Sequence, residues 1–79
     1  MRAYILIKTK PATSIEVVKR IKSKVKEVVQ AEAIYGRFDA LILVEAPKLE
    51  NINEIVYKVI EKDPNILHTE TSLVLTGSE

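Results

Sequence analysis

The stretch Val28–Ala46 reads VVQAEAIYGRFDALILVEA and contains two runs of strand-forming residues with a short turn between them. The first run extends from Val28 to Tyr35, and the second from Ala40 to Ala46. The turn begins with Gly36, a residue type that readily adopts the positive φ of a tight turn. Two short runs of this composition around a glycine-containing turn predict an antiparallel β-hairpin.

A strand and a helix precede this hairpin. The residues from Arg2 to Lys8 favour β-structure and predict the first strand. Thr13 followed by Glu16 has the spacing of a capping box, so it predicts the start of a helix. The apolar side chains of this helix recur every three or four positions, at Ile15, Val18, Ile21 and Val25.

A second helix and a last strand follow the hairpin. Asn51, with Glu54 three positions on, predicts the cap of the second helix. The segment 63–65 ends this helix, because Pro64 disfavours the helical conformation of the residue before it. The residues from Ile66 to Thr76 predict the last strand, with a short tail after it. The apolar positions of the second helix also follow the helical repeat, at Ile52, Ile55, Val56, Val59 and Ile60.

The predicted order is therefore βαββαβ, which is two βαβ halves joined by the hairpin. Right-handed crossovers place both helices on the same face of a four-stranded antiparallel sheet. This is the ferredoxin-like arrangement of the α+β class. The 79 residues leave no room for a linker, so we expect a single domain over residues 1–79.

The second face of this sheet is also rich in apolar residues. In the third strand, Leu41 and Leu43 alternate with Ile42 and Val44. The first strand repeats this pattern, with Tyr4 and Leu6 opposite Ile5 and Ile7. Two helices cover only one face, and a large uncovered apolar face is rare on a monomer. We therefore expect a symmetric homodimer packed through the second face, of the dimeric α/β-barrel type. The alternative is a monomer whose long side chains and C-terminal tail cover that face.

Charge and composition exclude several classes of function. Twelve basic residues face eleven acidic ones, so no strong field attracts nucleic acid or an anionic membrane. The longest apolar run, Ala40–Val44, is far too short to span a bilayer, and we expect a cytoplasmic protein. The chain has no cysteine, which excludes a thiol nucleophile. The lysines of the first helix favour a solvated face, with a nucleic-acid stripe as the alternative; they are Lys19, Lys22, Lys24 and Lys26.

Catalytic chemistry has little support in this sequence. His68 is the only histidine, and its neighbours in the last strand indicate a surface or interface position. The chain lacks the residues of a zinc site, and its glycines are too few for a phosphate-binding loop. We therefore expect no enzyme activity, no metal and no cofactor.

Two features favour small-molecule binding. Exposed N–H groups of the turn 35–39 can meet a carboxylate while Asp39 meets an ammonium, which together would recognise an amino acid. Thr69 and Thr71 lie on one face of the last strand, where their hydroxyls can also bind a polar ligand. Each feature also has a structural explanation, because glycine and aspartate suit turns and threonine suits strands.

These segments resemble the Lrp/AsnC (feast/famine) regulators. Residues 36–46 resemble the glycine-x-x-aspartate hairpin of the family, and residues 65–75 resemble its closing threonine-x-threonine strand. The similarity covers essentially the whole chain, but only the C-terminal effector domain of the family, the RAM domain. Because the chain begins at the first strand, we expect a stand-alone RAM domain without a helix-turn-helix and without direct DNA binding.

The resemblance implies a regulatory function and a set of site residues. It implies dimers, higher assemblies such as octamers, an amino-acid effector bound between dimers, and full-length Lrp/AsnC regulators as partners. Gly36 and Asp39 would contact the ligand, and Thr69 and Thr71 would be secondary contacts. The flanking wall would be formed by Tyr35, Arg37 and Phe38.

Three alternatives to this function remain open at this point. One is an ACT-like regulatory domain, which shares the βαββαβ order. Another is a small dimeric α/β-barrel enzyme of the monooxygenase or isomerase type. The third is an assembly domain that binds no ligand.

Overall fold

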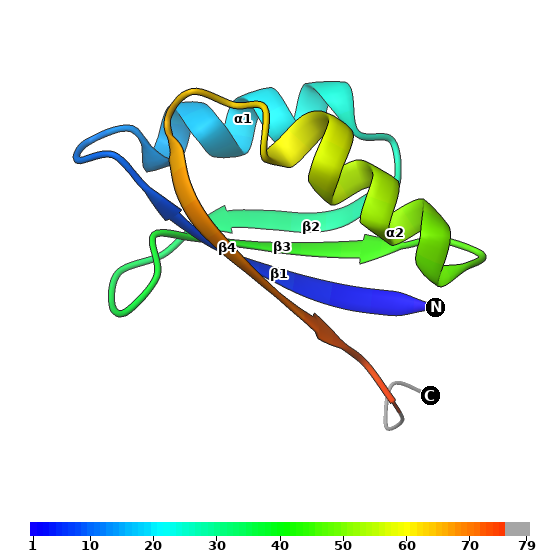
Figure 1. The fold of residues 1–79 in the computed structure, drawn as a ribbon. Helices are drawn as coiled ribbons and strands as arrows, with labels where there is room; N and C mark the ends of the chain where they lie inside the picture. The colour runs from blue at the N-terminus through cyan, green and yellow to red at the C-terminus, as the bar shows by residue number, and fades with distance from the viewer. Residues whose placement is uncertain (76–79) are drawn as a thin grey trace.

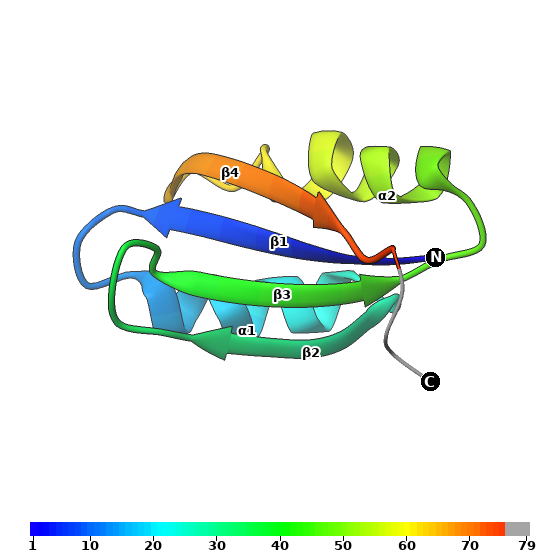
Figure 2. The same cartoon turned by 90° about the horizontal axis from the view of Figure 1, so that it is seen from below.

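The computed structural model describes residues 1–75 and confirms the expected order of elements. All four strands pair antiparallel in the order β2-β3-β1-β4, and both helices lie on one face of the sheet (Figure 1). Seen from the other side, the sheet lies in front of α1 (Figure 2). The elements are β1 (Arg2–Thr9), α1 (Ser14–Lys24), β2 (Val28–Ala33), β3 (Ala40–Glu45), α2 (Leu49–Ile55), the π-helix η1 (Val56–Ile60) and β4 (Ile66–Leu73).

The core fills the space between the helices and the two central strands. Ile5 of β1 pairs directly with Ile42 of β3, so their side chains share a face. Both are fully buried, as is Ile52 of α2 above them. No helix among residues 1–75 is long and apolar enough to cross a membrane.

The first helix begins where expected, but its cap differs from the prediction. The Thr13 hydroxyl donates to the Lys10 carbonyl at 2.8 Å instead of capping the helix, and Glu16 lies 3.9 Å from Arg20. The Thr13 N–H also closes a turn onto the Lys10 carbonyl at 3.3 Å, and Ala12 in that turn has a φ of 64°. The hydroxyl predicted to cap α1 therefore stabilises the turn before it.

The buried face of α1 agrees with the predicted one at Val18, Ile21 and Val25 and differs at Ile15. Val17, Val18 and Ile21 are buried, whereas Ile15 is 62% exposed. Helical spacing places Ile15 beside Val18, but the turn before α1 sets which side of the helix meets the sheet. The prediction that Ile15 packs in the core was wrong.

The second helix begins three residues earlier than predicted and widens at its end. Lys48 is the N-cap residue, and its N–H donates to the Asn51 side chain at 3.1 Å. Asn51 thus completes the cap from inside the helix, which corrects its predicted role. The last turn, η1, is π-helical, with the Glu61 N–H bonded to the Val56 carbonyl at 2.8 Å. The predicted apolar positions of this helix are confirmed, and all except the half-buried Val59 are buried.

Three strands are shorter than predicted, and β3 is shorter by one residue because it ends at Glu45. β2 ends at Ala33 because the Ile34 N–H bonds to the Asp39 carbonyl and closes a loop instead of continuing the ladder. β4 ends at Leu73. Thr76 and the predicted tail lie outside the described residues.

The face of the sheet away from the helices, here named the open face, is apolar only at its centre. Its central group consists of Tyr4, Leu6, Leu41 and Leu43, as the register of β1 and β3 requires. On β4 the residues paired with Tyr4 and Leu6 are Ser72 and Glu70, and β2 contributes Gln30 and Glu32. The prediction of a second apolar face is therefore confirmed for the two central strands and wrong for the edges.

Candidate functional site

Asp39 connects the β2–β3 loop to the end of β1. Its Oδ2 accepts a hydrogen bond from the Thr9 N–H at 2.8 Å, and its own N–H donates to the Ile7 carbonyl at 2.9 Å. Among residues 1–75, Oδ1 of Asp39 accepts no hydrogen bond. The carboxylate thus has a structural role through one oxygen, and the other oxygen has no hydrogen-bond partner in the described residues.

The remaining loop residues form an exposed rim. Lys8 donates from Nζ to the Arg37 carbonyl at 3.1 Å, which ties the middle of the loop to β1. Tyr35 and Arg37 are exposed, and Phe38 is half-buried. These three side chains are available to a neighbouring molecule rather than to the core of their own chain.

Gly36 has a φ of 151°, a conformation that residues with a side chain rarely adopt. A Cβ added at Gly36 would meet no atom within 4 Å, so the cost of a substitution is confined to the backbone. We expect Gly36→Ala to lower the free energy of unfolding by about 1 kcal/mol. Urea denaturation checks this, and an unchanged midpoint would contradict it.

Thr69 and Thr71 lie on the helix side of β4. Thr69 pairs with Ile7, and Thr71 pairs with Ile5, both of which point into the core. Because β4 is an edge strand, Thr69 is only half-buried and Thr71 is exposed.

Thr69 lines a cavity of about 380 Å³ between β4 and the end of η1. The other lining residues are Glu61, Ile66, Leu67 and His68. Sequence reasoning missed Glu61, and it placed His68 at the surface without a role. His68 is 3.6 Å from Glu70, and both side chains are exposed. No group of three or more potential metal ligands exists within residues 1–75.

The loop and the threonine row do not meet within one chain. Asp39 bonds to Ile7, and Ile7 pairs with Thr69, so β1 separates the two features by two strand spacings, or about 10 Å. None of the residues 35–39 lines the cavity next to Thr69 or the second cavity, which lies between α1 and the η1–β4 connection. Within a single chain, the loop and the threonine row are therefore separate features.

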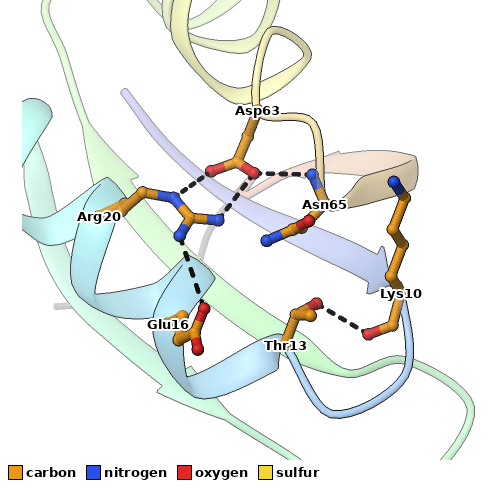
Figure 3. Close-up of polar contacts among 6 residues, drawn as sticks. All are labelled: Lys10, Thr13, Glu16, Arg20, Asp63 and Asn65. Atoms are coloured by element: carbon orange, nitrogen blue, oxygen red, sulfur yellow. Dashed lines mark hydrogen bonds and ion pairs between the residues drawn. The ribbon is translucent and has the colours of Figure 1, made fainter.

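A second cavity of about 380 Å³ lies between α1 and the η1–β4 connection. At its edge, the Arg20 guanidinium donates two hydrogen bonds to the buried Asp63 carboxylate, from Nε at 2.8 Å and from Nη2 at 2.9 Å (Figure 3). The Asn65 N–H also donates to Asp63 Oδ1 at 2.9 Å. The hydrogen bonds from Arg20 hold the pKa of the Asp63 carboxyl below its ordinary value, although burial opposes the shift.

The strand order β2-β3-β1-β4, with both helices on one face of the sheet, gives this chain the ferredoxin-like fold. The family model of the Lrp/AsnC ligand binding domain matches residues 2–77. The chain belongs to this family, which comprises ligand-binding regulatory domains rather than enzymes. The assignment replaces the enzyme and ACT-like alternatives.

Solved structures share the fold over nearly the whole chain. FFRP-DM1 is 28% identical, with a TM-score of 0.86, and the match covers 94% of this chain and 97% of that one. The hypothetical protein PHS023 from Pyrococcus horikoshii is 27% identical, with a TM-score of 0.87 and coverages of 98% and 92%. No curated protein matches the chain.

A longer regulator shares the fold over half its length. The transcriptional regulator NMB0573 from Neisseria meningitidis, solved as an L-Met complex, is 19% identical with a TM-score of 0.84. The match covers 99% of this chain and 51% of that one. At this identity the likeness concerns the fold alone.

Proposed function

We propose that this protein is a cytoplasmic regulatory module that binds an amino-acid effector at interfaces between its own copies. In this proposal it modulates transcription through full-length Lrp/AsnC regulators and does not bind DNA itself. The observation that carries the proposal is Asp39, whose carboxylate is held by Thr9 through one oxygen while the other is open.

An ammonium group is the natural partner of the open oxygen. A charge-assisted hydrogen bond between a carboxylate and an ammonium is about twice as strong as a neutral one. The N–H groups of the loop around Gly36 can receive the carboxylate of the same ligand. The L-Met bound to the Neisseria regulator supports an amino acid as the ligand class.

The effector site needs more than one chain. The loop 35–39 and the threonines Thr69 and Thr71 are open half-sites about 10 Å apart across β1. In our proposal, the loop of one copy approaches another copy, with Tyr35, Arg37 and Phe38 as the wall. An assembly of dimers, such as an octamer, provides such contacts.

The open face supports the dimer within this assembly. Its apolar centre requires cover, and its charged residues include both signs, with Arg2 and Lys8 against Glu45 and Glu70. Arg2 Nε is buried without a hydrogen-bond partner in residues 1–75. A buried donor without a hydrogen-bond partner destabilises the fold, and an acceptor from a second copy would remove this penalty.

Asp39→Asn tests the effector site most directly. Asparagine keeps an oxygen for the Thr9 N–H but loses the charge, so the loop should persist. Removing a charge-assisted contact costs about 1.5–3 kcal/mol, so the affinity should fall roughly tenfold to a hundredfold. A thermal-shift screen of the common amino acids identifies the ligand, and calorimetry compares the two proteins.

Asp39→Ala serves as the matched variant, because it loses the charge and the bond to Thr9. We expect it to lose affinity similarly and to lose about 1 kcal/mol of stability as well. Light scattering must show an intact assembly in each sample. Equal affinity of wild type and Asp39→Asn would contradict the site, whatever the family.

The isolated protein should not bind duplex DNA sequence-specifically. Phosphate binding would make any affinity steeply salt-dependent, and the formal net charge is only +1. A gel shift at about 150 mM salt, where the screening length is about 8 Å, checks this. A retained, sequence-specific band would contradict the partner role, whereas co-purification with a full-length regulator would support it.

A further inference from the structure

The cavity between α1 and the η1–β4 connection, here named the helix cleft, collects positive charge. Its lining includes four cations and one acid, whereas the whole chain has a formal net charge of +1. The cations are Arg20, Lys24, Lys58 and Lys62, and the acid is Asp63.

The acids near the helix cleft offset the charge of Arg20 and part of that of Lys58, and they leave Lys24 and Lys62 without an ion pair in residues 1–75. Asp63 is already fully engaged by Arg20 and the Asn65 N–H. Lys58 is 2.9 Å from Glu54, but both side chains are exposed, so the pair is weak. Lys24 and Lys62 form no ion pair with an acid in the described part of the chain.

The fold brings the elements that carry these cations together. The bidentate contact between Arg20 and Asp63 joins α1 to a segment 43 residues away, at the edge of the cleft. Lys24 lies one turn beyond Arg20 on the same side of α1. The wide turn of η1 places Lys62 at the cleft while its neighbour Glu61 lines the other cavity.

We propose that the helix cleft binds a small compound with two or three phosphate groups. Lysine binds phosphate as a compact point charge, and a concave space of about 380 Å³ lies within the range of small-ligand sites. Val59 and Pro64 add an apolar wall, which suits an organic group attached to the phosphates. The near-neutral charge of the whole chain opposes an extended nucleic acid.

This site is independent of the proposed effector site. The two cavities share no lining residue, and the loop with Asp39 lines neither. Asp39→Asn should therefore bind phosphate compounds as wild type does. The two proposals can succeed or fail separately.

The test is calorimetry on the assembled protein at about 100 mM salt, where the screening length is about 10 Å. Inorganic triphosphate, a nucleoside triphosphate and a short DNA duplex are titrated separately. Lys24→Gln and Lys62→Gln should each weaken triphosphate binding about tenfold, which is the loss of one charge-assisted contact. Tighter binding of the nucleoside compound would identify a nucleotide, and equal binding would identify the phosphate chain alone.

Lys22→Gln is the matched control. Lys22 is an exposed lysine of α1, two residues from both Arg20 and Lys24, so it lies on another side of the helix. It should change the affinity less than about twofold. Equal losses in all three variants would reveal diffuse attraction and overturn the proposal. Absence of triphosphate binding would also overturn the proposal. So would a DNA duplex that displaces triphosphate and depends on the same lysines.

Discussion

Leu43→Asp is expected to turn the assembled protein into a monomer. Leu43 pairs with Tyr4 on the open face, and it points away from the core residues Ile42 and Val44. In a dimer packed through this face, the substitution buries two unpaired carboxylates. Burying a charge costs several kcal/mol, and because Leu43 is only 4% exposed within its own chain, this cost falls on the fold of the chain as well as on the dimer. Light scattering behind a sizing column should give at least twice the 8.9 kDa chain mass for wild type and one chain mass for the variant.

Loss of the fold must be separated from loss of the dimer. Leu43 is only 4% exposed within its own chain, whereas Tyr4 is 40% exposed, so Tyr4→Glu disturbs the isolated chain less. Circular dichroism should show a folded monomer for Tyr4→Glu. Tyr57→Glu makes a similar change on α2–η1, where Tyr57 is 64% exposed, and it should leave the mass unchanged. A wild-type monomer at micromolar concentration would contradict the dimer.

Asp63→Asn is expected to destabilise the protein substantially at neutral pH. The variant removes the charge that Arg20 binds through two hydrogen bonds, and the asparagine amide keeps only one acceptor oxygen for the guanidinium. Hydrogen bonds to a buried charged group contribute about 1.5–3 kcal/mol, and we expect a loss of that size. Urea denaturation at one protein concentration measures it.

The pH dependence of this loss follows from the lowered pKa of Asp63. A carboxyl whose folded pKa lies below its unfolded value adds stability above the unfolded value, and this stability is lost as pH falls through the folded pKa. The ordinary pKa of an aspartate carboxyl is about 3.9. Wild type should therefore lose its advantage over Asp63→Asn below about pH 4.

Glu16→Gln provides the control for this pair. Glu16 lies 3.9 Å from the same guanidinium, but its side chain is 68% exposed. An exposed pair contributes about 0–1 kcal/mol, so Glu16→Gln should be nearly neutral at every pH. If the two variants were equally stable at neutral pH, the assigned role of Asp63 would be wrong.

Sequence alone predicted the order of elements and the fold class. The hairpin follows from two β-favouring runs around Gly36, and the second helix follows from apolar residues at helical spacing. These signals are local, because they depend on turn chemistry and on repeats of two and 3.6 residues. The sequence also predicted the turn that contains Asp39, because glycine and aspartate are both residue types that favour turns.

Element ends were less predictable. Thr13 and Asn51 both have the right chemistry for a helix cap, but each binds a different backbone group from the one expected. A side-chain hydroxyl or amide can form a hydrogen bond with several backbone groups close to it along the chain. Which one it binds depends on the turn before the helix, and the turn with Ala12 at positive φ was not foreseen.

The second apolar face followed from strand alternation, but its extent did not. Alternation shows which residues of one strand share a face, and it does not show which face that is. Register decides it: Leu43 pairs with Tyr4 on the open face, whereas Thr69 pairs with Ile7 on the helix side. The pairing of the edge strands therefore places polar residues at the edges of the open face, such as Glu70 on β4 and Glu32 on β2.

What only the tertiary structure decided is which distant residues meet. Arg20 and Asp63 are separated by 43 residues, and so neither local spacing nor composition relates them. The helix cleft above them also exists only because the two βαβ crossovers place α1 and η1 on the same face of the sheet. Turns and periodicity act within a few residues of chain, so the sequence by itself determined the elements and their order. Charge pairing and cavities depend on packing through space, and they appear only once those elements are assembled.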